Sequence, residues 1–173
     1  MNKLLIVVDY QRDFVDGALG FPGAEALDAP IAARIRQARQ EGWKILFTMD
    51  THGADYLNTQ EGRRLPVEHC IKGTPGHALF GETGKEARPE DPLLHKGALG
   101  SRELMAYFAE HPCDEIELVG LVSNMCVISN AVICKAALPE ARVCVREELT
   151  KSFDPDLHQK TMEVLRGMQI DVI

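Results

Sequence analysis

Short apolar runs alternate along this chain with segments in which apolar residues recur at helical spacing. Runs such as KLLIVVD and KILFTMD are brief, rich in β-branched residues and closed by a carboxylate, which is typical of buried strands in a parallel sheet. The pattern predicts strands at Lys3–Asp9, Lys44–Asp50, Pro92–Lys96, Ile116–Val122, Ala141–Arg146 and Gln169–Ile173, and helices at Pro30–Glu41, Ser101–Glu110, Val127–Leu138 and Pro155–Arg166. In the last helix Leu157, Met162 and Leu165 are expected on the inner face.

This alternation predicts an α/β fold: a single-domain, three-layer α/β/α structure with a six-stranded, mostly parallel, Rossmann-like sheet. A chain of 173 residues is expected to form one domain, residues 1–173. Two segments interrupt the pattern. Tyr10–Gly23 is expected to be a loop, and the polar segment Thr51–Asp91 is long enough to predict a functional connection that binds substrate or metal.

Composition narrows the classes of partner. The net charge is −7 and no basic stripe is present, which argues against nucleic acid and anionic membranes as partners. No apolar run reaches the length of a membrane span, and the first residues lack the pattern of a signal peptide. The five cysteines include no CxxC pair, which is typical of a reducing compartment, so a cytoplasmic location is expected.

The predicted strands bring reactive side chains to one edge of the sheet. Asp9, Asp50 and Lys96 end three strands, and Cys126 follows the fourth. Ligands of open parallel sheets bind beyond the carboxyl ends of the strands. A thiol, an ammonium and carboxylates at that edge are the groups needed for covalent acyl transfer.

Cys126 is predicted to lie in the first turn of the helix that follows Ser123 and Asn124, two capping residue types. There the helix dipole favours an anion, so the thiol is expected to ionise and to act as a nucleophile. The alternative is that Cys126 packs as a small buried hydrophobe.

Five motifs resemble those of the isochorismatase-like cysteine hydrolases, and among them the nicotinamidases. They are VVDYQRDFVDGALGFPGAE from Val7, DTH from Asp50, LPVEHCIKGTPG from Leu65, the lysine Lys96 after its short strand, and GLVSNMC from Gly120. The resemblance implies a catalytic triad of Asp9, Lys96 and Cys126. It also implies a cis peptide bond between Leu121 and Val122, with the backbone N–H groups of Val122 and Cys126 forming the oxyanion hole.

The resemblance further implies one divalent metal ion, with zinc expected and iron or manganese as alternatives, bound by Asp50, His52 and His69. Glu61 is the acidic residue best placed to add a ligand, although its position is explained equally well by a solvated glutamate in a loop. Phe14 is the aromatic residue expected to stack on a flat substrate ring.

The activity implied is hydrolysis of nicotinamide to nicotinate and ammonia through a thioester on Cys126. Two departures leave other small amide, carbamoyl or ureido substrates open: Asn124 and Met125 replace a common Asp–aromatic pair, and the only tryptophan, Trp43, precedes the second strand. A non-catalytic binding domain and a hydrolase that relies on its metal alone also stay open. The apolar helix after Cys126 suggests burial beyond the sheet, as in a homo-oligomer.

Overall fold

Six parallel strands form one sheet in the computed structural model, which describes residues 1–173. Their order in the sheet is β3-β2-β1-β4-β5-β6. Each predicted strand is present, and the predicted fold class is confirmed. The strands are β1 (Lys3–Val8), β2 (Lys44–Asp50), β3 (Leu93–Lys96), β4 (Glu115–Leu121), β5 (Arg142–Lys151) and β6 (Asp171–Val172).

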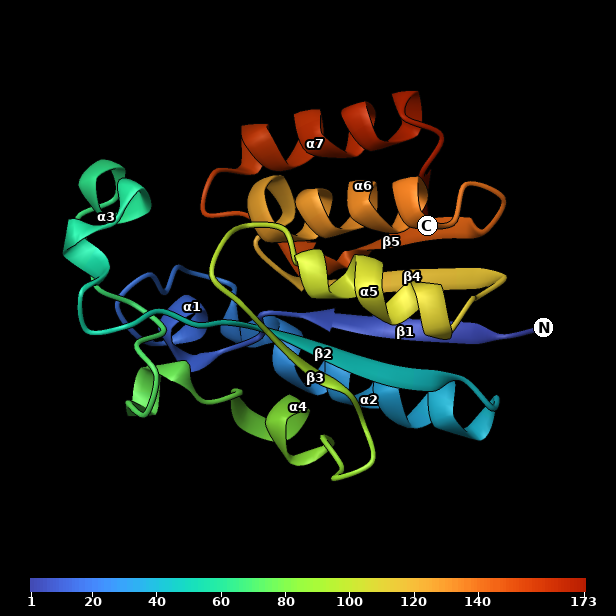
Figure 1. Cartoon of the computed structure of the whole chain (residues 1–173), viewed down its shortest axis with the longest axis horizontal. Helices are drawn as coiled ribbons and strands as arrows, with labels where there is room; N and C mark the ends of the chain where they lie inside the picture. The colour runs from blue at the N-terminus through green and yellow to red at the C-terminus, as the bar shows by residue number, and fades with distance from the viewer.

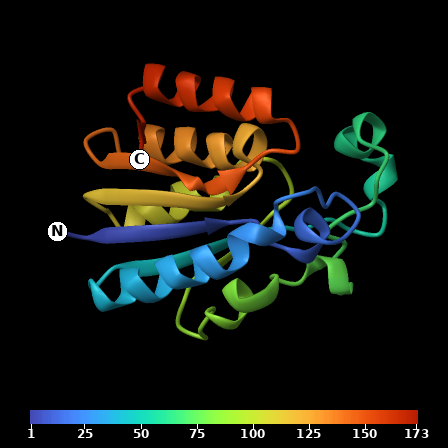
Figure 2. The ribbon, with the colours of Figure 1, turned by 180° about the vertical axis from the view of Figure 1, so that it is seen from behind.

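Helices cover both faces of the sheet. Figure 1 shows α5 and α6 in front of the strands, and Figure 2, from behind, shows α2 in front. The α-helices are α1 (Arg12–Val15), α2 (Asp28–Gln40), α3 (Gln60–Arg64), α4 (Gly81–Lys85), α5 (Arg102–Glu110), α6 (Ile128–Ala137) and α7 (Pro155–Gly167). Three short 3-10 turns, η1 (Glu25–Leu27), η2 (Tyr56–Asn58) and η3 (Pro75–His77), and a π-helical turn, η4 (Ser123–Val127), complete the set. No helix is long and apolar enough to span a membrane.

Strand β1 shows why the buried strands are apolar throughout. Successive side chains of a strand point to opposite faces, so Leu4 and Ile6 pack with α5, α6 and α7, whereas Leu5 and Val7 pack with α1 and α2. Because helices cover both faces, neither set meets water. The uninterrupted apolar run in the sequence follows from this double coverage.

The order of the strands reverses between β1 and β4. From β1 the chain continues to β2 and β3 on one side, and then crosses to β4 and β5 on the other. Val8 lies in register with both Thr48 and Gly120, and Gly120 has φ 111°. A Cβ atom there would overlap the carbonyl oxygen of Val8, so this close approach requires glycine. Figure 1 shows α1 and α3 beyond the carboxyl ends of these strands.

Four expectations need correction. Helix α1 lies inside the expected loop Tyr10–Gly23, and the expected polar connection contains the short helices α3 and α4. Strand β5 continues to Lys151, past a register shift in its pairing with β4. The strand was expected to end earlier because its middle residues are polar and partly exposed, so the apolar run stops before the strand does. Leu157 is 39% exposed rather than inward, since it lies in the first turn of α7, before the buried face begins.

Candidate active site

Asp9, Lys96 and Cys126 lie together at the point where the strand order reverses. The Nζ atom of Lys96 is 2.6 Å from Asp9 Oδ2 and 3.5 Å from Cys126 Sγ. Asp9 directly follows β1, Lys96 ends β3 and Cys126 lies in η4 after β4. All three side chains are buried. The structure therefore brings together the three residues that the sequence singled out.

Lys96 connects this group to a second carboxylate. Its Nζ atom donates to Asp50 Oδ1 at 3.2 Å and to the carbonyl oxygen of Ala98 at 2.9 Å. Burial opposes the charge of Lys96, but the facing groups, Asp9 above all, outweigh it and raise the pKa of Lys96. The ammonium therefore keeps its proton and serves as a fixed positive charge beside the thiol.

The Cys126 thiol differs from the sequence-based expectation. Burial raises the pKa of Cys126 well above its usual value, and the neighbouring Asp9 charge raises it further, against the opposing effect of Lys96. Burial therefore opposes the ionisation that the sequence pattern predicts, and Cys126 lies in a π-helical turn rather than in the first turn of α6. The thiol needs a base to become a nucleophile.

Asp9 is the carboxylate next to that thiol. Burial raises the pKa of Asp9 despite the charge of Lys96, which makes the carboxylate a better proton acceptor than an ordinary aspartate. The hydroxyl of Thr48 donates to Asp9 Oδ1 at 2.7 Å and fixes its orientation. Asp9 also has φ 45°, an uncommon backbone conformation for a residue other than glycine.

The turn that carries Cys126 is π-helical, and α6 begins only at Ile128. The peptide bond between Leu121 and Val122 is cis, as the resemblance implied. Asn130 fixes the turn to the loop after β3. Its side-chain amide donates to the carbonyl oxygens of Cys126 at 2.8 Å and Leu99 at 3.3 Å, and its Oδ1 accepts from the backbone of Ser101 at 2.9 Å.

A second cluster, the donor cluster, consists of Asp50, His52, Glu61 and His69, whose possible ligand atoms all lie within 4.8 Å of one another. Asp50 Oδ2 is 3.0 Å from His52 Nε2 and 3.3 Å from His69 Nε2. Glu61 Oε1 is 3.7 Å and 3.8 Å from the same two nitrogen atoms. Glu61 thus joins the three residues that the resemblance implied.

The geometry of the donor cluster fits a divalent metal ion. Ligands about 2.1 Å from one ion lie ~3.0–3.4 Å apart in octahedral or tetrahedral arrangements. The spacings from Asp50 to the two imidazole nitrogen atoms fall in this range, and those from Glu61 are somewhat longer. His69 Nδ1 is 2.8 Å from the carbonyl oxygen of Val67. Because a carbonyl oxygen can only accept, Nδ1 carries the proton and donates it, and Nε2 of the neutral ring directs its lone pair at the cluster. Burial would raise the pKa of Asp50, but His52, His69 and Lys96 lower it well below its usual range, so Asp50 is ionised.

Sequence reasoning missed two residues that hold these groups in place. Gln11 is fully buried, accepts from the backbone N–H of Asp50 at 2.8 Å and donates to its carbonyl oxygen at 2.9 Å. Asp13 accepts from the backbone N–H of Cys70 at 2.7 Å, next to the ligand candidate His69. Both belong to the polar run YQRD after β1, where amide and carboxylate side chains within an expected loop were the available signal.

An apolar cavity of about 370 Å³ opens beside both clusters. Cys126 lines it, together with Asp50, Glu61 and His69. Phe14 lines the cavity, and its ring centroid is 5.6 Å from that of His69. The remaining lining residues are Ala18, Leu19, Gly20, Phe21, Leu65, Leu99, Val122, Met125 and Phe153.

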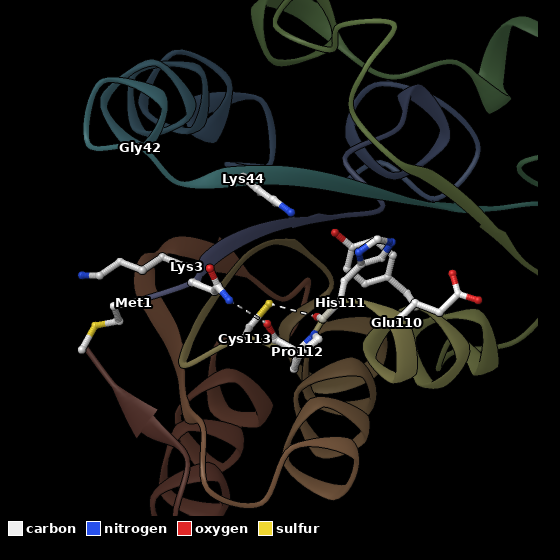
Figure 3. A pocket seen from close by; sticks show the side chains of 10 residues that line it. Met1, Lys3, Gly42, Lys44, Glu110, His111, Pro112 and Cys113 are labelled. Carbon is white, nitrogen blue, oxygen red and sulfur yellow. Dashed lines mark hydrogen bonds between the residues drawn. The ribbon is translucent and has the colours of Figure 1, made fainter.

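A smaller cavity of about 210 Å³ lies at the opposite, amino edge of the sheet (Figure 3). It is lined by Lys3 and Lys44 from the strand starts and by His111 and Cys113. Cys113 donates to the carbonyl oxygen of His111, and burial raises the pKa of its thiol. Lys3, Lys44 and Glu110 line this cavity, but no side chain donates a hydrogen bond to the Cys113 sulfur, whereas Lys96 donates to Cys126 Sγ.

The Isochorismatase domain model matches residues 3–173. Nicotinamidase of Saccharomyces cerevisiae is 26% identical over 214 residues, covering 99% of both chains, and nicotinamidase/pyrazinamidase of Mycobacterium tuberculosis is 25% identical, covering 99% of this chain and 98% of that protein. A nicotinamidase/pyrazinamidase structure from Bacillus subtilis has a TM-score of 0.87 at 25% identity, covering 99% of both chains. A Pyrococcus horikoshii pyrazinamidase in complex with zinc has a TM-score of 0.86 at 24% identity, covering 100% of this chain and 99% of that one. The chain belongs to the isochorismatase family.

Proposed function

We propose that the protein is a metal-containing cysteine amidohydrolase that converts nicotinamide and water to nicotinate and ammonia. The observation that carries the proposal is Lys96, which lies between Asp9 and Cys126 behind an apolar cavity. The similarity to nicotinamidases of Saccharomyces cerevisiae and Mycobacterium tuberculosis along nearly the whole chain supports the choice of substrate.

Acylation begins with transfer of the Cys126 proton to Asp9. The thiolate, stabilised by the Lys96 ammonium, attacks the carboxamide carbon and forms a C–S bond. The backbone N–H groups of Val122 and Cys126 donate to the resulting oxyanion. When the C–N bond breaks, Asp9 returns its proton to the leaving nitrogen, ammonia departs and a thioester remains on Cys126.

Deacylation uses the same groups in reverse. Asp9 accepts a proton from water as the water oxygen attacks the thioester carbon. The C–S bond then breaks, the proton on Asp9 returns to the Cys126 sulfur, and nicotinic acid leaves and ionises to nicotinate, its proton passing to the released ammonia. Burial raises the pKa of both the Asp9 carboxyl and the Cys126 thiol, which favours exchange of the proton between these two groups.

Asp50, His52 and His69, with Glu61 as a fourth ligand, would hold the metal ion. Zinc is the first choice for two carboxylates and two imidazoles, and iron or manganese accept the same donors. Zinc in the Pyrococcus horikoshii pyrazinamidase supports that choice. When bound, such an ion supplies a Lewis acid for the pyridine nitrogen. Elemental analysis of the purified protein against His69→Ala tests the site, with loss of bound zinc expected in the variant.

Ammonia release from nicotinamide by the purified protein tests the proposal. Cys126→Ala is expected to lower turnover at least ~10³-fold, the scale on which nucleophile deletion acts. The matched control is Cys134→Ala, which removes a buried thiol on α6 and is expected to retain turnover. Ammonia release only from ureido or carbamoyl compounds would overturn the substrate, and full activity of Cys126→Ala would overturn the nucleophile.

A further inference from the structure

We infer that the active-site cavity takes heteroaromatic amides that carry an apolar substituent on the ring, and that Phe21 and Phe153 set this specificity. The inference deepens the proposed function and rests on it, because the carboxamide end of the substrate is assigned to Cys126. The size, the lining and the mouth of the cavity support it.

The cavity is larger and more apolar than a single-ring amide requires. Its volume of about 370 Å³ is within the range of about 300–1,000 Å³ found for drug-sized ligands, and ten of its fourteen lining residues are hydrophobic. The polar lining, Asp50, Glu61 and His69, belongs to the donor cluster. Beyond the groups that hold the amide and the ring nitrogen, the walls therefore offer only apolar contacts.

Three large apolar side chains from separate segments surround the outer part of the cavity. Phe21 precedes α2, Leu99 follows β3, and Phe153 lies between β5 and α7. The rings of Phe21 and Phe153 meet edge to face, with centroids 6.4 Å apart. Phe153 is 58% exposed and Leu99 is 41% exposed. Apolar side chains that gather around a cavity mouth and stay exposed mark a surface that a ligand covers.

The chemistry of the ring indicates where the substituent lies. In nicotinamide, ring carbon 5 is meta both to the carboxamide and to the ring nitrogen. A group on that carbon points away from Cys126 and from the donor cluster at once. The remaining walls are the apolar ones, so an alkyl group at carbon 5 is expected to bury itself against Phe21 and Phe153 and to leave water.

The test compares kcat/KM for nicotinamide and for 5-propylnicotinamide. The protein is expected to prefer the propyl compound at least ~10-fold, the lower end of what one added methylene is worth in an apolar pocket. Phe153→Ala and Phe21→Ala are expected to lower this preference ~10-fold. Val164→Ala, which shortens an exposed apolar side chain on α7 outside the cavity, is the matched control and should leave the preference unchanged.

A variant that fills the cavity distinguishes the effect of losing apolar contacts from the effect of losing cavity volume. Ala18→Trp places a large ring in the same cavity from an exposed position and should lower kcat/KM for 5-propylnicotinamide more than for nicotinamide. The inference is overturned if the protein hydrolyses nicotinamide but discriminates against 5-propylnicotinamide. It is also overturned if Phe153→Ala and Val164→Ala show the same ratio of kcat/KM for the two amides. Either result leaves the proposed function intact. Failure to hydrolyse either amide overturns both.

Discussion

Two clusters of buried charged side chains lie against the sheet, and only one of them contains a thiol. At the carboxyl edge, Lys96 lies among Asp9, Asp50 and the Cys126 sulfur. Within β4, Glu117 accepts from Arg34 at 2.9 and 3.0 Å and from Arg146 at 2.7 and 3.2 Å. Lys96 is 3% exposed and Glu117 is 1% exposed, so burial does not distinguish the clusters.

The difference lies in what completes each cluster. Both oxygen atoms of Glu117 are held by two guanidinium groups, and Arg34 also stacks on Trp43. The Lys96 cluster instead contains a thiol that lines a cavity. A buried ion pair that borders a thiol and a cavity is a candidate reaction centre, whereas one enclosed by other side chains is not. The Glu117 cluster should accordingly affect stability, and the Lys96 cluster should affect chemistry.

Asp9→Asn should show the largest effect. The amide cannot accept the Cys126 proton, so kcat for nicotinamide is expected to fall ~10³-fold, or about 4 kcal/mol of transition-state stabilisation. Circular dichroism should show an unchanged fold. A variant that retains more than a tenth of the wild-type kcat would show that Asp9 is not the base.

Glu117→Gln should show the reverse behaviour. It removes the buried carboxylate that pairs with the buried Arg34 and the half-buried Arg146, and urea unfolding is expected to show a loss of ~3 kcal/mol in the free energy of unfolding. Turnover per folded molecule should stay within about twofold, since Glu117 does not contact the thiol, the donor cluster or the cavity. Lost turnover in a folded variant would mean that the two clusters are coupled.

Gly120→Ala tests the strand segment between the two clusters. A Cβ atom at residue 120 would overlap the Val8 carbonyl oxygen, and the positive φ adds strain. A loss of ~2 kcal/mol in the free energy of unfolding is expected, together with lower turnover, because Val8 precedes Asp9. The control is Gly42→Ala, where a Cβ atom meets no neighbour and only the φ strain remains. Equal losses in both variants would contradict the close approach as the cause.

The smallest effect is a pH dependence of stability. Burial opposes ionisation of Glu117, but the hydrogen bonds from Arg34 and Arg146 outweigh it and lower the pKa of Glu117 below its usual value of 4.5. Because the folded-state pKa is lowered, the stabilisation is present above about pH 5 and is lost as the pH falls through the folded-state value, at no more than ~1.4 kcal/mol per pH unit. The stability difference between wild type and Glu117→Gln should shrink below pH 4.5. A constant difference would contradict the assignment.

Much of the fold could be predicted because each buried strand is covered on both faces and reads as a continuous apolar run. Short helices escaped prediction, since α1 and α4 are a single turn each and carry no periodicity. Glu117 escaped for a related reason: a glutamate within an apolar strand is indistinguishable in sequence from one at an exposed position. Its buried place depends on Arg34 and Arg146, which come from distant segments.

The grouping of Asp9, Lys96 and Cys126 was predictable because each of them ends or follows a strand, and parallel strands bring those ends to one edge. The state of Cys126 was not, since it depends on how completely the turn is buried and on the nearby Asp9 charge. The outer cavity was not predictable either. Phe21 and Phe153 are far apart in sequence and meet only in the folded chain.

Covalent catalysis by Cys126 is tested most directly by acid-quenched mass spectrometry of the protein during turnover of nicotinamide. A nicotinoyl adduct is expected on the peptide that contains Cys126, and it should disappear when the substrate is exhausted. The control is Cys126→Ala, which should show neither adduct nor turnover. Steady hydrolysis without an adduct, accompanied by full activity of Cys126→Ala, would contradict the thioester and leave Asp9 and Lys96 as a structural ion pair.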